Sequence, residues 1–159
     1  MVRLAGREPQ GSLYRFFKSK PEYSLPILGA RPKVANQHTL PRILLIDDTP
    51  ETAELLSFAL RDRGYEVSAE GYTTSLNELI REQRADALVL NLTTWDMSEW
   101  LFDSVREDAG HRELPVVIIS DTPEKAEPKL RERKAQRVLL VAKPFTGGQV
   151  AQALAQLLE

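Results

Sequence analysis

The 159-residue sequence contains no cysteine. Disulfide bonds and thiolate metal sites are therefore excluded, and the redox compartment stays open. Long hydrophobic runs are also absent, because no apolar segment approaches the length of a membrane-spanning helix and the amino terminus lacks the apolar core of a secretory signal. We therefore expect a soluble, cytoplasmic protein.

Glycine is missing from a loop where a nucleotide-binding protein would need it. The loop Asp47-Asp48-Thr49-Pro50 follows the first expected strand and has no glycine that could cradle a phosphate. A flavin or nucleotide enzyme is therefore unsupported. We expect no enzymatic activity, no cofactor of that kind and no small-molecule substrate.

Charge and proline are distributed unevenly along the chain. Residues 1–40 carry seven Lys/Arg and two acidic residues, a net charge of +5, whereas residues 41–159 carry 14 Lys/Arg and 21 acidic residues, a net charge of −7. Five of the ten prolines lie within residues 1–41. This composition predicts a basic, mostly irregular arm at 1–40 joined to a folded domain at 41–159.

One segment of the arm, Ser12–Lys18, combines a candidate N-cap with three aromatic and two basic residues. It could form one or two helical turns with an apolar side. Such a segment could dock on a partner, on nucleic acid or on an anionic surface, or else pack on its own domain or stay disordered. We favour the interpretation that it packs on its own domain or stays disordered.

From Pro41 onward, short aliphatic runs that end at polar residues alternate with apolar residues at helical spacing. Such runs are typical of strands buried on both faces, and the alternation predicts a doubly wound α/β domain with a five-stranded parallel sheet and five helices. The expected strands are Arg42–Ile46, Tyr65–Ala69, Asp86–Leu92, Leu114–Ser120 and Val138–Ala142.

Three of the expected helices carry specific predictions. The first begins near Pro50, stops at Gly64 and turns an inner stripe towards the core. The third is expected to begin at the N-cap Ser98. The fourth is interrupted by two prolines and should be short or irregular. The inner stripe of the first helix is Leu55, Leu56, Ala59 and Leu60, and the prolines of the fourth are Pro123 and Pro128.

Polar residues stand at four of the expected strand ends. They are Asp47 with Asp48, Asn91, Ser120 and Lys143. The carboxyl ends of parallel strands meet at one edge of a sheet, so these groups should converge in a single shallow cleft. Two adjacent carboxylates favour a hard cation such as Mg²⁺, and a lysine can neutralise a phosphoryl group or pair with the carboxylates.

This pattern resembles the receiver domain of two-component response regulators over residues 41–159. The resemblance rests on Leu45–Asp48, Asp86–Leu92, Leu114–Ser120 and Lys143–Phe145, in the family's order and spacing. It implies a flavodoxin-like (βα)5 fold and a role in phosphorelay signal transduction. The partner implied is a protein, such as a histidine kinase or another signalling protein.

Carried across residue by residue, the resemblance makes Asp47 and Asp48 the metal-binding acidic pair, Ser120 the hydroxyl that follows the phosphoryl group and Lys143 the lysine that contacts it. Asn91 stands at the position of the phosphoacceptor aspartate. A carboxamide has neither the charge nor the chemistry to form a stable acyl phosphate. Replacing one of three carboxylates should also weaken Mg²⁺ binding.

Two further positions depart from the family's pattern. Trp95 stands where such domains usually have proline, and Leu140 stands where many have the aromatic residue that moves on activation. We therefore predict a pseudo-receiver: a protein–protein interaction module with a vestigial pocket and no phosphorylation cycle. Trp95 and Trp100 are candidate partner contacts, and we expect Trp95 to be partly exposed because its loop is polar.

Each prediction has an alternative. Asp47 and Asp48 could simply cap the first helix and pair with Lys143. Ser120 could be only a turn residue. A phosphorylatable receiver could use Asp48, Thr93 or Ser120 as a substitute acceptor, although the sequence supplies no obvious general base.

A third class of function makes the protein an adaptor whose basic arm, residues 1–40, binds nucleic acid or an anionic surface. No helix-turn-helix pattern follows the last expected helix, so direct transcriptional control is not expected.

Overall fold

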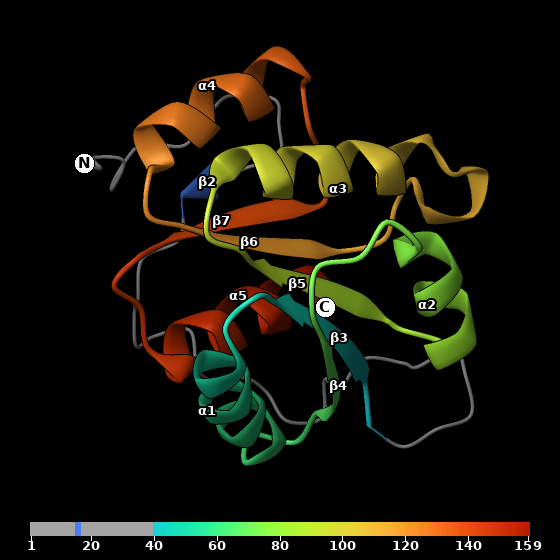
Figure 1. Cartoon of the computed structure of the whole chain (residues 1–159), viewed down its shortest axis with the longest axis vertical. Helices are drawn as coiled ribbons and strands as arrows, with labels where there is room; N and C mark the ends of the chain where they lie inside the picture. The colour runs from blue at the N-terminus through green and yellow to red at the C-terminus, as the bar shows by residue number, and fades with distance from the viewer. Residues whose placement is uncertain (1–14, 17–39) are drawn as a thin grey trace.

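A computed structural model describes the backbone of residues 15–16 and the whole of residues 40–159. Its single sheet has the strand order β2-β7-β6-β5-β3-β4, and all neighbouring strands are parallel (Figure 1). The five parallel strands and five helices predicted for residues 41–159 are confirmed, and the two-residue strand β2 adds a sixth strand to the sheet. The strands are β2 (Arg15–Phe16), β3 (Arg42–Asp47), β4 (Glu66–Glu70), β5 (Ala87–Asn91), β6 (Val116–Ser120) and β7 (Val138–Ala142). The helices are α1 (Pro50–Arg61), α2 (Leu76–Gln83), α3 (Trp95–Glu107), α4 (Pro123–Glu132) and α5 (Gly147–Leu158), with a 3₁₀ turn, η2, at Ala109–His111.

The helices cover both faces of the sheet. α1 and α5 lie on one face, and α2, α3 and α4 lie on the other (Figure 1). Successive strand residues point to opposite faces, so Ile43 and Leu45 belong to the core under α1 and α5, whereas Leu44 and Ile46 belong to the other core. All five residues of the central strand β5 are buried, which explains its nearly unbroken apolar sequence.

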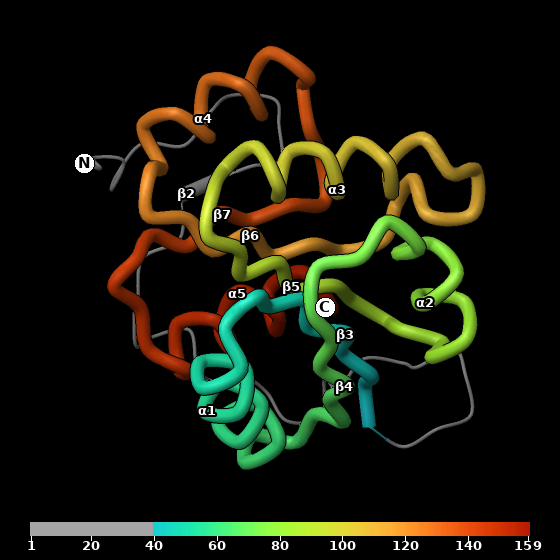
Figure 2. Tube along the Cα trace, in the orientation of Figure 1, coloured from blue at the N-terminus to red at the C-terminus, as the bar shows by residue number. Residues whose placement is uncertain are grey.

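α1 and α5 run close together on their face of the sheet, as the tube in Figure 2 shows. The approach depends on the first residue of α5: a Cβ atom built on Gly147 would lie 2.5 Å from the Cβ of Ala59 in α1. No real side chain fits at that distance. Gly147 therefore sets the packing of α5 beside the helix that follows Asp47 and Asp48.

The expected inner stripe of α1 is wrong at one residue. Leu56 and Leu60 are buried as predicted, but Leu55 is 72% exposed and Phe58, also on α1, is 71% exposed. Among the described elements, the helix packs mainly on the sheet and on α5, so the stripe that it buries is narrower than its apolar content suggests. The outer side of α1 thus presents two large apolar side chains to solvent.

The boundaries of α3 and α4 also differ from the prediction. The N-cap of α3 is Thr94, whose Oγ1 accepts a hydrogen bond from the backbone N–H of Met97 at 3.3 Å, and not Ser98, which is buried. α4 is a regular ten-residue helix, neither short nor irregular, with Pro123 at its start and Pro128 inside it. Proline suits the first turn, where its missing N–H has no helical partner.

The carboxyl end of α4 is fastened to α3 by Arg133. Its guanidinium donates to the two carboxylate oxygens of Asp103 at 2.8 and 2.9 Å and to Glu99 at 2.6 Å. These carboxylates raise the pKa of Arg133 above its ordinary value, the bonds to Asp103 contributing most. Ala126 and Leu130 also pack into the core and hold α4 against the sheet.

Within residues 1–39 the structure describes only Arg15–Phe16, which form the strand β2 and not the helical turn predicted for that segment. An edge strand of the sheet offers backbone partners that an isolated helical turn lacks, which explains why strand pairing prevails there. The rest of the arm, with its predicted partners, and the domain boundary at 40 lie outside what the structure tests. None of the described helices is long and apolar enough to cross a membrane.

Candidate functional site

The parallel sheet brings the predicted polar residues to one edge. Asp47 ends β3 and Asn91 ends β5, and the two are opposite each other in the strand register. Ser120 ends β6, and Lys143 follows the last residue of β7. The parallel register therefore places all four strand ends at one edge of the sheet, as expected from the alternation of strands and helices.

Asp47 is a buried carboxylate whose two oxygens both accept hydrogen bonds. Its Oδ1 accepts from the backbone N–H of Thr49 at 2.9 Å, and its Oδ2 accepts from Nδ2 of Asn91 at 2.9 Å. Burial raises the pKa of Asp47, and the two hydrogen bonds offset part of the rise. The neighbouring charge of Asp48 raises this pKa further, whereas Lys143 lowers it.

Asp48 is half-buried and is hydrogen-bonded to the loop that follows β5. Its Oδ2 accepts from the hydroxyl of Thr93 at 2.6 Å and from the backbone N–H of the same residue at 3.2 Å. The contact joins the loop before α1 to the loop before α3. The sequence indicates Thr93 only as a substitute acceptor of phosphate, and this contact was not predicted. Thr93 lies two residues after the end of β5, and Asp48 directly follows β3, the strand next to β5. This position could have indicated the contact between them.

Lys143 lies within reach of the acidic pair without pairing to it. Its Nζ donates to the backbone carbonyl of Leu92 at 3.3 Å, and among the described residues it forms no ion pair with Asp47 or Asp48. The alternative in which the lysine pairs with the carboxylates is therefore wrong for this structure. The positive charge of the ammonium group nevertheless lowers the pKa of Asp47.

Ser120 closes the turn that leads into α4. Its Oγ accepts from the backbone N–H of Thr122 at 3.0 Å and lies 3.5 Å from the hydroxyl of the same residue. This is the turn geometry expected of a serine at a strand end. The hydroxyl is thus engaged by its own loop, in agreement with the turn alternative.

The site offers few free ligands for a metal ion. No group of three or more His, Asp or Glu residues within metal-binding reach occurs in the described part of the chain. Both oxygens of Asp47 and one oxygen of Asp48 already accept hydrogen bonds. The Oδ1 of Asn91, by contrast, is buried with no hydrogen-bond partner. Two carboxylates and one amide oxygen fit a hard cation only loosely.

The two tryptophans have opposite environments. Trp95 is 5% exposed and packs in the core under α2, α3 and α4, so the expectation of partial exposure is wrong. Because α3 begins at Trp95 and not at Ser98, Trp95 lies on the inner face of this helix and not in a polar loop. Trp100, also on α3, is 50% exposed.

Comparison with protein-family models found no match. The chemotaxis protein CheY1 of Helicobacter pylori is 31% identical to this chain over 111 residues, which cover 66% of the chain and 86% of CheY1. This chain belongs to the response-regulator receiver family. The probable transcriptional regulatory protein TcrX of Mycobacterium tuberculosis is 32% identical over 118 residues, 73% of this receiver but only 49% of TcrX. The receiver thus spans about half the length of that relative.

The fold of this receiver is shared with solved structures. The chemotaxis response regulator CheY4 of Vibrio cholerae superposes with a TM-score of 0.62 at 23% identity, over 76% of this chain and 100% of CheY4. At this identity the likeness concerns the fold. It supports the flavodoxin-like arrangement predicted for residues 41–159.

Proposed function

We propose that this receiver is a pseudo-receiver, which acts in two-component signalling as a protein-interaction module and is not phosphorylated on the usual aspartate. The observation that carries the proposal is Asn91 at the buried end of β5, where the family has its phosphoacceptor. A carboxamide lacks the anionic oxygen that attacks phosphorus. Here the Nδ2 of Asn91 also donates a hydrogen bond to the carboxylate of Asp47.

The hydrogen bonds around the site support a surface held in one state. Asp48 is bound by Thr93, and Lys143 is bound by the carbonyl of Leu92, so both charged side chains have partners in the chain itself. Leu140, at the position of the aromatic residue that moves in many receivers, is fully buried in β7. These features favour binding without a switch, and the proposed role involves no turnover.

Exposed apolar side chains indicate where a protein partner would bind. Leu55 and Phe58 project from α1, three residues apart and therefore on one side of the helix. α1 begins two residues after Asp48, so this apolar pair lies on the element that leads out of the site. Trp100 is a second candidate contact on α3. The partner that we propose is a histidine kinase or another signalling protein.

The test is incubation of the full chain with acetyl phosphate and Mg²⁺, followed by intact-mass measurement. We expect no phosphoryl group on the natural chain and one on the Asn91→Asp variant, which restores a carboxylate at the strand end. Labelling of an acidic residue in the natural chain would overturn the proposal. Parallel incubation without Mg²⁺ shows whether labelling of the variant needs the metal.

We further propose a weak Mg²⁺ site formed by Asp47, Asp48 and the Oδ1 of Asn91. The partnerless amide oxygen supports it, and the hydrogen bonds already made by the two carboxylates make it weak. A bound Mg²⁺ would supply a positive charge that offsets the two carboxylates. Titration with Mg²⁺ in the Trp100→Phe variant, monitored by Trp95 fluorescence, should show weaker binding than in the same variant carrying Asn91→Asp.

One observation favours a second candidate, a receiver that uses Thr93 as a substitute acceptor. The Thr93 hydroxyl donates to the Asp48 carboxylate at 2.6 Å, so a base for that hydroxyl is present. In this case the label would be a phosphate ester resistant to hydroxylamine, whereas an acyl phosphate is cleaved. Thr93→Ala would abolish labelling and Asn91→Ala would not.

A further inference from the structure

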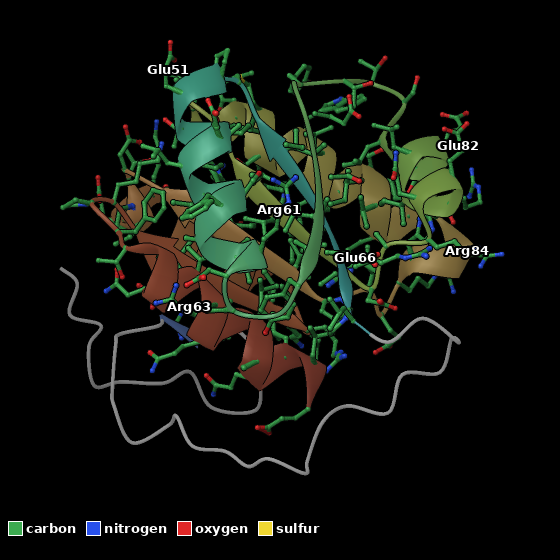
Figure 3. All side chains as sticks on the ribbon, turned by 90° about the horizontal axis from the view of Figure 1, so that it is seen from below. Glu51, Arg61, Arg63, Glu66, Glu82 and Arg84 are labelled. Carbon is green, nitrogen blue, oxygen red and sulfur yellow. The ribbon has the colours of Figure 1, made fainter. Side chains whose placement is uncertain are left out.

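The two outer edges of the sheet are protected in different ways. At β4, the backbone N–H of Glu66 donates to the carbonyl of Pro41, so the next residue, Val67, turns its backbone outward. The Val67 carbonyl accepts a hydrogen bond at 3.0 Å from Arg61, which Figure 3 shows reaching from α1 towards β4. Charged Glu66 and Glu70 end the strand and are exposed. Charges and a side-chain donor thus discourage pairing at this edge.

The opposite edge, β7, has no such protection in its own sequence. Its five residues, Val138–Ala142, are all apolar. The N–H of Lys143 donates to β6 and the carbonyl of Arg137 accepts from β6, so the backbone of every second residue between them faces outward. Those residues are Val138, Leu140 and Ala142. A flat, uncharged strand with free backbone groups would be a template for pairing with another chain.

β2 lies on this edge (Figure 1). It runs parallel to β7, with Arg15 opposite Leu139 and Phe16 opposite Leu140. Because Leu140 faces outward, the geometry of a parallel ladder turns the backbone of Arg15 towards β7 and that of Phe16 away from it. The arm therefore supplies hydrogen-bond partners for the outward-facing backbone groups of β7, which no charged residue within β7 protects.

We propose that β2 guards the β7 edge, and that a chain unable to place β2 pairs through β7 with a second copy of itself. The inference goes beyond the proposed function, since it concerns the sheet edge remote from α1 and holds whether or not the site is phosphorylated. The occupant is a second copy because an apolar edge is complementary to itself in a two-fold antiparallel arrangement. Neither strand then brings a charge into the ladder.

The residues that flank β7 set the salt dependence of this dimer. An antiparallel pair centred on Leu140 places Arg137 opposite Lys143 of the second copy at both ends of the paired segment. Like charges at that spacing repel, and salt screens the repulsion. The dimer should therefore form more readily at high ionic strength, unlike an association driven by opposite charges.

The experiment uses the full chain with Arg15→Pro, which removes the backbone N–H that faces β7. Arg15→Ala is the matched control, because it removes the same side chain and keeps the N–H. Size-exclusion chromatography with light scattering at several protein concentrations should give twice the monomer mass for Arg15→Pro and the monomer mass for Arg15→Ala. Adding Ala142→Lys to Arg15→Pro should restore the monomer, since a charge at the edge opposes pairing.

Two results would overturn the proposal: a monomeric, folded Arg15→Pro chain at all concentrations, or dimers of Arg15→Ala that match those of Arg15→Pro. Circular dichroism establishes that each variant is folded. Hydrogen exchange of the natural chain is the second measurement and needs no variant. The Leu140 amide should be protected in the monomer, and rapid exchange there would show that β2 does not cover the edge.

Discussion

Nδ2 of Asn91 donates a hydrogen bond to Oδ2 of Asp47 at 2.9 Å, across the tips of the neighbouring strands β5 and β3. Two carboxylates at these positions would repel each other in a buried setting. The amide instead supplies a donor to the buried acid, so it stabilises the arrangement that would otherwise need a cation. The same amide is the basis of the proposal that the site is not phosphorylated.

The Asn91→Asp variant should be less stable than the natural chain near neutral pH. The change removes the donor to Asp47 and places a second negative charge beside it, at an expected cost of about 1–3 kcal/mol in the free energy of unfolding. Chemical denaturation at pH 7 measures the loss. Added Mg²⁺ should recover much of it in the variant and little in the natural chain, and equal stability without metal would contradict this prediction.

The raised pKa of Asp47 predicts a specific dependence of stability on pH. In the folded chain this pKa lies above the ordinary 3.8, so the folded state binds more protons in the interval between the two values. The contribution of Asp47 to stability is therefore largest below 3.8 and is lost as the pH rises through the folded-state pKa. Asp47→Asn lacks this titration. The free energy of unfolding of the natural chain minus that of the variant should fall as the pH rises above about 4, whereas a difference that does not change with pH would contradict the prediction.

Removing the Thr93 hydroxyl should release Asp48. Thr93→Val loses the 2.6 Å bond and keeps the backbone N–H, so we expect stability to fall by no more than about 1 kcal/mol at this exposed position. Mg²⁺ affinity, measured by calorimetric titration, should rise because Oδ2 of Asp48 then accepts only the longer bond from the backbone N–H of residue 93. Thr93→Ser keeps the hydroxyl and should behave as the natural chain does. Unchanged affinity in Thr93→Val would mean that the bond does not compete with the metal.

Gly147 and Gly148 form a matched pair for testing the contact between α1 and α5. A methyl group on Gly147 would meet the Cβ of Ala59 at 2.5 Å, whereas one on Gly148 would meet the end of the Arg63 side chain at 3.3 Å and Oγ1 of Thr146 at an ordinary contact distance of 3.7 Å. Gly147→Ala should therefore lower the free energy of unfolding by about 1–3 kcal/mol. Gly148→Ala should change it by less than about 0.5 kcal/mol, as is usual where neighbours can move. Thermal or urea unfolding distinguishes them.

The position of the site could be predicted from the sequence because parallel strands leave little choice. Once the strands that end in Asp47 and Asn91 are both in one parallel sheet, their carboxyl ends must lie at the same edge. The hydrogen-bond partners could not be predicted in the same way. Thr93 and Leu92 contact the charged residues through loop geometry, which the apolar pattern does not encode.

The errors arose where a local signal competed with packing. Ser98 has the chemistry of an N-cap, but Thr94 caps α3 and Trp95 becomes a core residue one turn earlier. Leu55 fits the helical spacing of a buried stripe, yet nothing among the described residues covers it on that side of α1. In both cases the residue type indicates one local structure, and packing against neighbours that are distant in the sequence favours another.

Pro128 sits inside α4 and has no N–H to offer the carbonyl of Glu124, one turn earlier. The first turn of α4 is therefore coupled to the rest of the helix by one bond fewer, while Arg133 anchors the opposite end to α3. The N-terminal turn of α4 is consequently less stable than its C-terminal turn. Thermal unfolding of this helix should therefore start beside Ser120 and spread towards Arg133.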